Sequence, residues 1–219
     1  VLLPPEMRRD PVRLSMAPWV CWESVSCRID GRKSESAEVN FVMGMNRLSD
    51  CGVPDLWVFS DGSVRMEDRR GGSGVVVCVG EVHALEVLET VAVSGGLLAS
   101  SFQAELRALE CALGWLCEFV GDWWSVVIAS DSQSALQRLR GSRGDLQEEV
   151  LVVCAERLSE LCMRGKYVSF VWVPGHSGIV GNELADAAAA CGVQCDVAGV
   201  SCMRKDVHAR VRECMKWRV

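Results

Sequence analysis

Four acidic residues occupy positions where a carboxylate can do chemistry. Asp61 and Asp131 each follow a short apolar run that is typical of a buried strand. Open α/β sheets form active sites at strand ends, because the loops there are free to serve function while the strands stay rigid. Glu105 precedes a leucine of a helical apolar stripe, so it lies at the border of the buried helix face, where a carboxylate is costly unless paired or bound to a cation. Asp186 lies in an alanine-rich segment whose small side chains allow close approach.

If these carboxylates converge, they predict a site for divalent metal ions. Several carboxylates at one sheet edge repel each other unless cations neutralise them, and an all-oxygen ligand set without His or Cys favours Mg²⁺ or Mn²⁺. Two such ions about 4 Å apart activate a water and stabilise the leaving oxygen in phosphodiester cleavage. An acidic pocket becomes a phosphate-binding pocket once metal is bound. We therefore expect two Mg²⁺ ions, for which Mn²⁺ can substitute.

Taken singly, each of these residues also has an ordinary structural role. Asp131 can cap the helix that follows it, and Glu105 in a first helical turn favours the helix dipole. Asp186 can be an exposed helix acid, and His176, in a Pro-Gly-His-Ser-Gly stretch, can be a turn residue. The hypothesis of a site therefore depends on the residues acting together.

The periodicity of apolar residues predicts a mixed α/β sheet between residues 55 and 192. Three apolar runs are followed by a helix, a strand, two helices, a strand and a helix, an order that favours a five-stranded sheet with three antiparallel strands, parallel additions and flanking helices. We expect residues 60–63 to form a turn that ends the first strand. The strands are predicted at residues 56–59, 75–79, 88–93, 125–129 and 168–173, and the helices at 101–120, 132–140, 146–163 and 182–191.

The two flanks differ from this central part. Four of the six prolines fall within the first 18 residues, and residues 1–54 show no clear period, so we interpret them as a linker or the tail of an upstream domain. Residues 51–200 hold ten basic and twenty acidic side chains, whereas residues 201–219 hold six basic and two acidic. A nucleic-acid ligand would therefore need bound cations and the basic extension, residues 193–219, to offset the acidic centre.

Composition argues against a membrane-spanning protein and against a secreted protein held together by disulfides. No apolar stretch reaches the roughly 18 residues that a membrane span needs, so we predict no membrane partner. The twelve cysteines show no CxxC pair, which favours reduced, mostly buried thiols and an intracellular, reducing compartment, nucleus or cytoplasm. A zinc site built from the last cysteines and His208 is the less favoured alternative. A chain that begins with Val1 is expected to be a piece of a longer polyprotein.

Four motifs, in order, resemble the type 1 ribonuclease H family. Each motif contains one of the four acidic residues, and together they span about residues 55–192. The resemblance is more to the ribonuclease H domain of a non-LTR retrotransposon polyprotein than to the viral kind. The motifs are Ser60-Asp61-Gly62-Ser63, Gln103-Ala104-Glu105-Leu106-Arg107-Ala108-Leu109, Ser130-Asp131-Ser132, and Val173-Pro174-Gly175-His176-Ser177-Gly178 followed by Gly181-Asn182-Glu183-Leu184-Ala185-Asp186.

The resemblance implies a ribonuclease H-like fold and an endoribonuclease that hydrolyses the RNA strand of RNA–DNA hybrids during reverse transcription. It implies an upstream reverse transcriptase domain as a partner, so that residues 1–54 would be the end of a polymerase region. The motif acids correspond to the family's metal-binding carboxylates, and His176 to its loop histidine, which helps to shuttle protons or release product. The residues that the resemblance places on the substrate are Gly62, Ser63, Ser132 and Asn182.

Two other functions are compatible with the same fold. A non-catalytic module that only binds nucleic acid or a partner domain usually lacks one or more carboxylates, and here all four and the histidine are present. A DNA-cutting integrase or transposase ends its site with a different helix acid. One departure from the family concerns hybrid recognition: residues 100–102, Ser-Ser-Phe, stand where many members have Asn or Gln ahead of the helix glutamate.

Overall fold

The computed structural model describes residues 24–97, 99–141 and 149–195. Within them, a six-stranded mixed sheet has the strand order β1-β6-β5-β2-β3-β4. The strands β1, β6, β5 and β2 run parallel, and β3 pairs antiparallel with both β2 and β4. The strand bounds are β1 Val25–Arg28, β2 Leu56–Arg65, β3 Arg70–Val79, β4 Glu86–Gly96, β5 Ser125–Ser130 and β6 Tyr167–Trp172.

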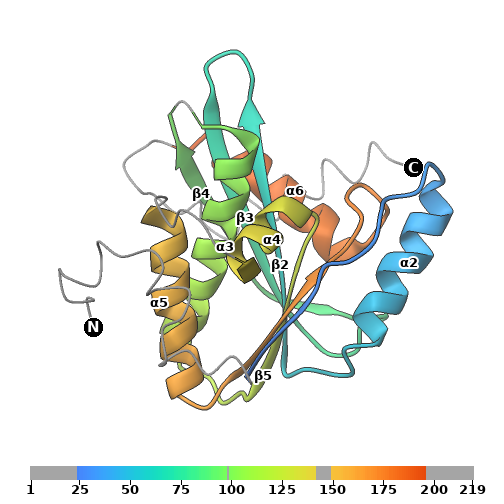
Figure 1. The fold of residues 1–219 in the computed structure, drawn as a ribbon. Coiled ribbons are helices and arrows are strands. Elements are labelled where there is room, and N and C mark those ends of the chain that lie inside the picture. Colours follow the sequence, from blue (N-terminus) through green and yellow to red (C-terminus); the bar gives the residue numbers. More distant parts are fainter. Residues whose placement is uncertain (1–23, 98, 142–148, 196–219) are drawn as a thin grey trace.

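Helices cover both faces of this sheet (Figure 1). One core contains leucines of α3, α4 and α5 packed on β2, β3 and β5, and a second contains residues of α2 and α6 packed on the opposite face of the same strands. The sheet is therefore the middle layer of three. The helix bounds are α2 Ala37–Ser49, α3 Ser101–Glu118, α4 Gln133–Gly141, α5 Glu149–Met163 and α6 Val180–Gly192.

Glycines of β3 bring α6 unusually close to the sheet. A Cβ atom at Gly74 would lie 2.2 Å from the Ala185 carbonyl oxygen, and one at Gly72 would lie 2.2 Å from that of Ala189. A side chain at either position would push the helix away, so the glycines of the strand and the alanines of the helix together set the height of Asp186 above the sheet.

The predicted order of elements is confirmed, but the first predicted strand ends too early. Residues 60–63 do not form a turn, because β2 continues through them as a ladder with β3, in which Asp61 pairs with Gly74 and Gly62 with Ser73. Asp61 therefore lies inside β2 and not past its end. Turn-forming residue types suggested a break, and pairing with β3 overrides that local preference.

The structure adds an N-terminal strand and helix to the predicted five-stranded sheet. β1 pairs in parallel with β6, and α2 packs so tightly that a Cβ atom at Gly44 would lie 2.3 Å from Ile179 Cδ1. Part of the segment interpreted as a linker thus belongs to the fold. Residues 1–23 and 196–219, hence most of the basic extension and His208 of the zinc alternative, lie outside the described residues.

Nine cysteines fall within the described residues, and none of the nine is paired in a disulfide there. Burial raises the pKa of Cys78 and of Cys154 to about 12, so these two act as small apolar side chains of the core. Of the helices in the described ranges, none is both long and apolar enough to cross a membrane.

Candidate functional site

Three of the predicted acids meet at one point of the sheet. Carboxylate oxygens of Asp61, Glu105 and Asp131 lie within 4.8 Å of one another, and we call these residues the inner carboxylate group. Asp61 and Asp131 are neighbours because β2 and β5 are adjacent parallel strands in which Ser60 pairs with Ser130, the residue before each acid. Glu105 comes from the second turn of α3, which crosses β2 here.

Gly62 allows α3 to come this close. A Cβ atom at Gly62 would lie 2.3 Å from the Glu105 backbone nitrogen, so no other residue fits without moving the helix. The Gly62 N–H donates to Asp61 Oδ1 at 2.7 Å and to Glu105 Oε2 at 3.1 Å. The start of α3 is fixed by a reciprocal capping box between Ser100 and Gln103. Backbone and cap thus position Glu105 before any ligand binds.

Burial and mutual repulsion perturb all three acids. Burial, followed by the charges of Asp131 and Asp186, raises the pKa of Asp61 to about 8. Burial, followed by the charges of Asp61 and Asp131, raises the pKa of Glu105 to about 10. The pKa of Asp131 is also raised by burial, although a hydrogen bond from Asn182 opposes this. Three negative charges are therefore unfavourable here without a cation, and the all-oxygen donor set fits Mg²⁺ or Mn²⁺.

A second group of ligand atoms lies beside the first. His176, Glu183 and Asp186, which we call the outer group, also have ligand atoms within 4.8 Å of one another. His176 Nδ1 is 3.7 Å from Asp186 Oδ2, and the histidine side chain is 65% exposed. The charge of Asp186 acts on both Asp61 and Asp131 by raising their pKa, which places the two groups next to each other.

The loop before α6 holds His176 in an unusual backbone conformation. Its φ is +51°, in the left-handed region that residues other than glycine rarely adopt. Glu183 Oε1 accepts a hydrogen bond from the Gly178 N–H at 3.1 Å, and Ser177 Oγ donates to the Pro174 carbonyl at 2.5 Å. The loop is thus tied at both ends around the histidine. Sequence reasoning did not single out Glu183, although its position three residues before Asp186 places the two on one helix face.

Lys33 is a second residue near the site that sequence reasoning missed. Its Nζ donates to the Gly175 carbonyl at 2.7 Å, and its charge lowers the pKa of Asp131. A Cβ atom at Gly175 would lie 2.1 Å from Asp131 Oδ2, so this loop touches the carboxylate directly. The Trp172 Nε1–H donates to the Asp131 carbonyl at 2.9 Å. No periodicity or motif marks Lys33 in the sequence, because it lies in an irregular segment.

The residues predicted to contact substrate have structural roles in the fold. Ser132 Oγ accepts the Ala135 N–H at 3.4 Å and caps α4. Asn182 is only 2% exposed, and its Oδ1 has no hydrogen-bond partner among the described residues. Gly62 and Ser63 are half-buried in β2 beside the inner carboxylate group. Their contacts with a substrate stay predictions.

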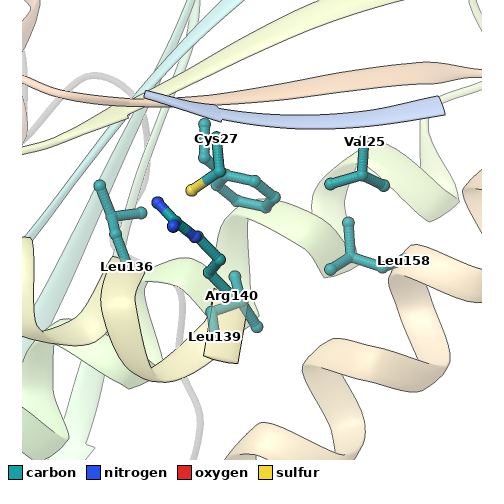
Figure 2. Close-up of a pocket in the computed structure, with 7 residues that line it drawn as sticks. Val25, Cys27, Leu136, Leu139, Arg140 and Leu158 are labelled. Carbon is teal, nitrogen blue, oxygen red and sulfur yellow. The ribbon is translucent and has the colours of Figure 1, made fainter. Parts of the chain in front are cut away.

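A separate cavity of about 230 Å³ lies between β1, β6, α4 and α5 (Figure 2). It is mainly apolar and contains none of the residues of the inner carboxylate group or the outer group. Burial raises the pKa of its one thiol, Cys27, to about 11. The residues that line it are Val25, Cys27, Leu136, Leu139, Arg140, Leu158 and Phe170.

Comparison with known proteins places this arrangement in a family. The model of the RNase H family matches residues 54–194, a range that begins just before β2, ends just after α6 and leaves out β1 and α2. LC11-RNase H1, isolated from compost by a metagenomic approach, is 21% identical with a TM-score of 0.51, over 64% of this chain and 96% of that one. LC9-RNase H1, described as a type 1 RNase H with the type 2 active-site motif, is 21% identical with a TM-score of 0.51, over 74% and 84%. RNase H1 of the halophilic archaeon Halobacterium salinarum NRC-1 is 25% identical with a TM-score of 0.48, over 64% and 97%.

Proposed function

The chain belongs to the RNase H family, and we propose that it hydrolyses the RNA strand of RNA–DNA hybrids at the inner carboxylate group with the help of the outer group. It is a ribonuclease H, and the family acts on RNA–DNA hybrids. The observation that supports this location is the convergence of Asp61, Glu105 and Asp131 within 4.8 Å, beside Asp186.

The same residues would hold two Mg²⁺ ions. Asp61 and Asp131 would contact both ions, whereas Glu105 and Asp186 would each favour one. When bound, such ions lower the pKa of a water and stabilise the leaving oxygen in phosphodiester cleavage. The raised pKa values support this assignment, because acids that are hard to ionise together release their protons when a cation replaces them.

The remaining residues would orient the hybrid and move a proton. Hydrolysis joins a water oxygen to phosphorus and breaks the bond from phosphorus to O3′, so it leaves a 5′-phosphate and a 3′-hydroxyl. The attacking water gives up a proton, and the leaving O3′ takes up a proton. His176 is exposed beside Asp186, where it can carry that proton between solvent and the site. Gly62 and Ser63 lie on β2 next to the carboxylates, where polar groups can contact 2′-hydroxyls across the minor groove.

The first test is cleavage of labelled substrates by the full 219-residue chain. We expect cutting of the RNA–DNA hybrid with Mg²⁺ or Mn²⁺, no cutting in EDTA, and none of single-stranded RNA, double-stranded RNA or duplex DNA. Asp131→Asn should lower kcat by about 10³-fold or more, because it removes a charge that neutralises the cations. Asp122→Asn, at an exposed acid away from the site, is the matched control and should cut normally.

Two results would contradict the assignment. Parental cutting by Asp131→Asn would remove the inner carboxylate group as the site. A folded chain that binds the hybrid and cuts no substrate would favour the non-catalytic binding module.

We also propose that the hybrid arises in retrotransposon reverse transcription, beside an upstream reverse transcriptase domain, on the strength of the motif resemblance.

A further inference from the structure

The segment between β1 and α2 runs along the edge of the candidate site. It lies outside residues 54–194, which match the family, yet it reaches the loop that contains His176. The contact is the hydrogen bond from Lys33 Nζ to the Gly175 carbonyl at 2.7 Å. Gly175, which accepts this hydrogen bond, is also the residue whose backbone lies against the Asp131 carboxylate. A chain element added to the family's domain thus puts a cation next to the candidate site.

Side chains from two helices hold this segment on both sides of Lys33. The Gln133 amide, at the start of α4, donates to the carbonyls of Ile29 at 2.5 Å and Gly31 at 3.1 Å. The buried Asn40 of α2 accepts the Ser34 N–H at 2.7 Å and donates to the Ser34 carbonyl at 2.9 Å. Lys33 is therefore preorganised by its backbone, which reduces the entropy lost when a ligand binds its ammonium group.

Arg47 of α2 ties the same segment to the end of β6. Its guanidinium donates to the Trp172 carbonyl at 3.1 Å and to the Asp30 carbonyl, and it lies 4.7 Å from the centre of the Trp172 ring. Arg47 is occupied by these contacts, whereas Lys33 is exposed. Lysine has three N–H donors, and within the described ranges Lys33 uses one of them, on a neutral carbonyl, and forms no salt bridge. The ammonium group retains both charge and donors for an anion.

We propose that Lys33 binds a phosphate of the RNA–DNA hybrid beside the inner carboxylate group, so that the segment between β1 and α2 is part of the substrate-binding surface. This inference rests on the proposed function for the identity of the ligand. It also answers a charge problem, since residues 51–200 hold twice as many acidic as basic side chains. A fixed cation at this edge attracts a phosphate to a region that otherwise repels it.

The experiment distinguishes phosphate binding by Lys33 from a purely structural role of its hydrogen bond to Gly175. Hybrid affinity is measured by fluorescence anisotropy with the full chain in EDTA, over a range of KCl concentrations, and kcat and KM are measured with Mg²⁺. Lys33→Met should weaken binding and raise KM by about tenfold, and should lower the slope of log K against log[salt] by about one, because one fewer counterion is released. Lys33→Arg should restore most of the affinity and the slope, since it keeps the charge.

The matched control is Lys166→Met, which removes the same charge at the opposite end of β6. There the lysine donates to the Trp123 carbonyl and lies over the rings of Trp123 and Trp124. This variant should keep the wild-type KM and salt slope even if its Tm falls.

The outcomes distinguish this inference from the proposed function. If wild type cuts the hybrid and Lys33→Met changes kcat or Tm but leaves KM and the salt slope unchanged, Lys33 is only a tie to the Gly175 loop and the inference is wrong. If wild type binds the hybrid without cutting it, the proposed function fails, and the anisotropy series still decides the role of Lys33. If wild type neither binds the hybrid in EDTA nor cuts it with Mg²⁺, both are wrong.

Discussion

The inner carboxylate group and the outer group differ in what holds them. Asp61 and Asp131 are set by paired strands, and Glu105 by a capped helix that Gly62 admits, so the inner group is fixed by backbone hydrogen bonds. His176, in contrast, stands on a loop with a positive φ, and its side chain is largely exposed. The inner group therefore suits ion binding, which needs fixed ligands, whereas His176 of the outer group suits proton transfer with solvent.

The strongest test of this difference between the two groups is how the stability of the chain depends on pH. In EDTA we expect unfolding to become easier as pH rises above about 4, because the folded chain still holds protons that the unfolded chain has released, on Asp61 up to about pH 8 and on Glu105 up to about pH 10. The loss should be on the order of several kcal/mol, since each unit of pKa shift is worth about 1.4 kcal/mol. Urea unfolding at a series of pH values measures it.

Two additions show whether the inner group causes this loss. Mg²⁺ should stabilise the chain, and more so at higher pH, because it replaces the bound protons. Asp61→Asn should make the pH profile less steep, because it removes one of the two shifted acids, whereas Asp122→Asn should leave the profile unchanged. A profile in EDTA that is flat between pH 4 and 8 would contradict the electrostatic account of the inner group.

Replacing the histidine tests the outer group. His176→Ala should lower kcat by about 10²-fold with little change in KM, since a positioned proton carrier contributes about that much. Metal-dependent stability should stay, because the ligands of the inner group are intact. His83→Ala, at the other exposed histidine of the described residues, should behave as wild type. If kcat fell equally in His176→Ala and His83→Ala, the effect would not depend on the position of His176 beside the site.

Of the six residues in the two groups, the sequence named all but Glu183, whereas it placed the elements that position them less well; the roles of these residues stay predictions. The four acids could be named in advance because carboxylate chemistry restricts the choice, whereas His176 was named only through the resemblance to the ribonuclease H family. The placement of Asp61 inside β2 could not, since it depends on pairing with β3 far along the chain. Ser60-Asp61-Gly62-Ser63 has the composition of a turn, and only the ladder and the crossing helix show why Gly62 belongs in a strand.

The N-terminal part was missed for a related reason. β1 is four residues long, its burial alternates only between intermediate and exposed, and it is stabilised by β6, more than 130 residues later. Lys33 reaches the site through ties made by side chains of α2 and α4, which no local pattern encodes. Contacts between distant segments were therefore the part that sequence alone did not supply.

Loss of the side-chain hydrogen bonds that hold the segment between β1 and α2 should have a smaller effect. Gln133→Ala removes the two hydrogen bonds to the Ile29 and Gly31 carbonyls, and should cost about 1 kcal/mol of unfolding free energy and raise KM a few-fold, as Lys33 loses its fixed position. Gln137→Ala, on the exposed side of α4, is the control for helix propensity and should change neither. The inner group should be unaffected, so Mg²⁺ should stabilise Gln133→Ala as much as wild type. If Gln133→Ala instead abolished the stabilisation by Mg²⁺, the inner group would depend on this added segment, and the contrast between the backbone-fixed inner group and the loop-held His176 would be wrong.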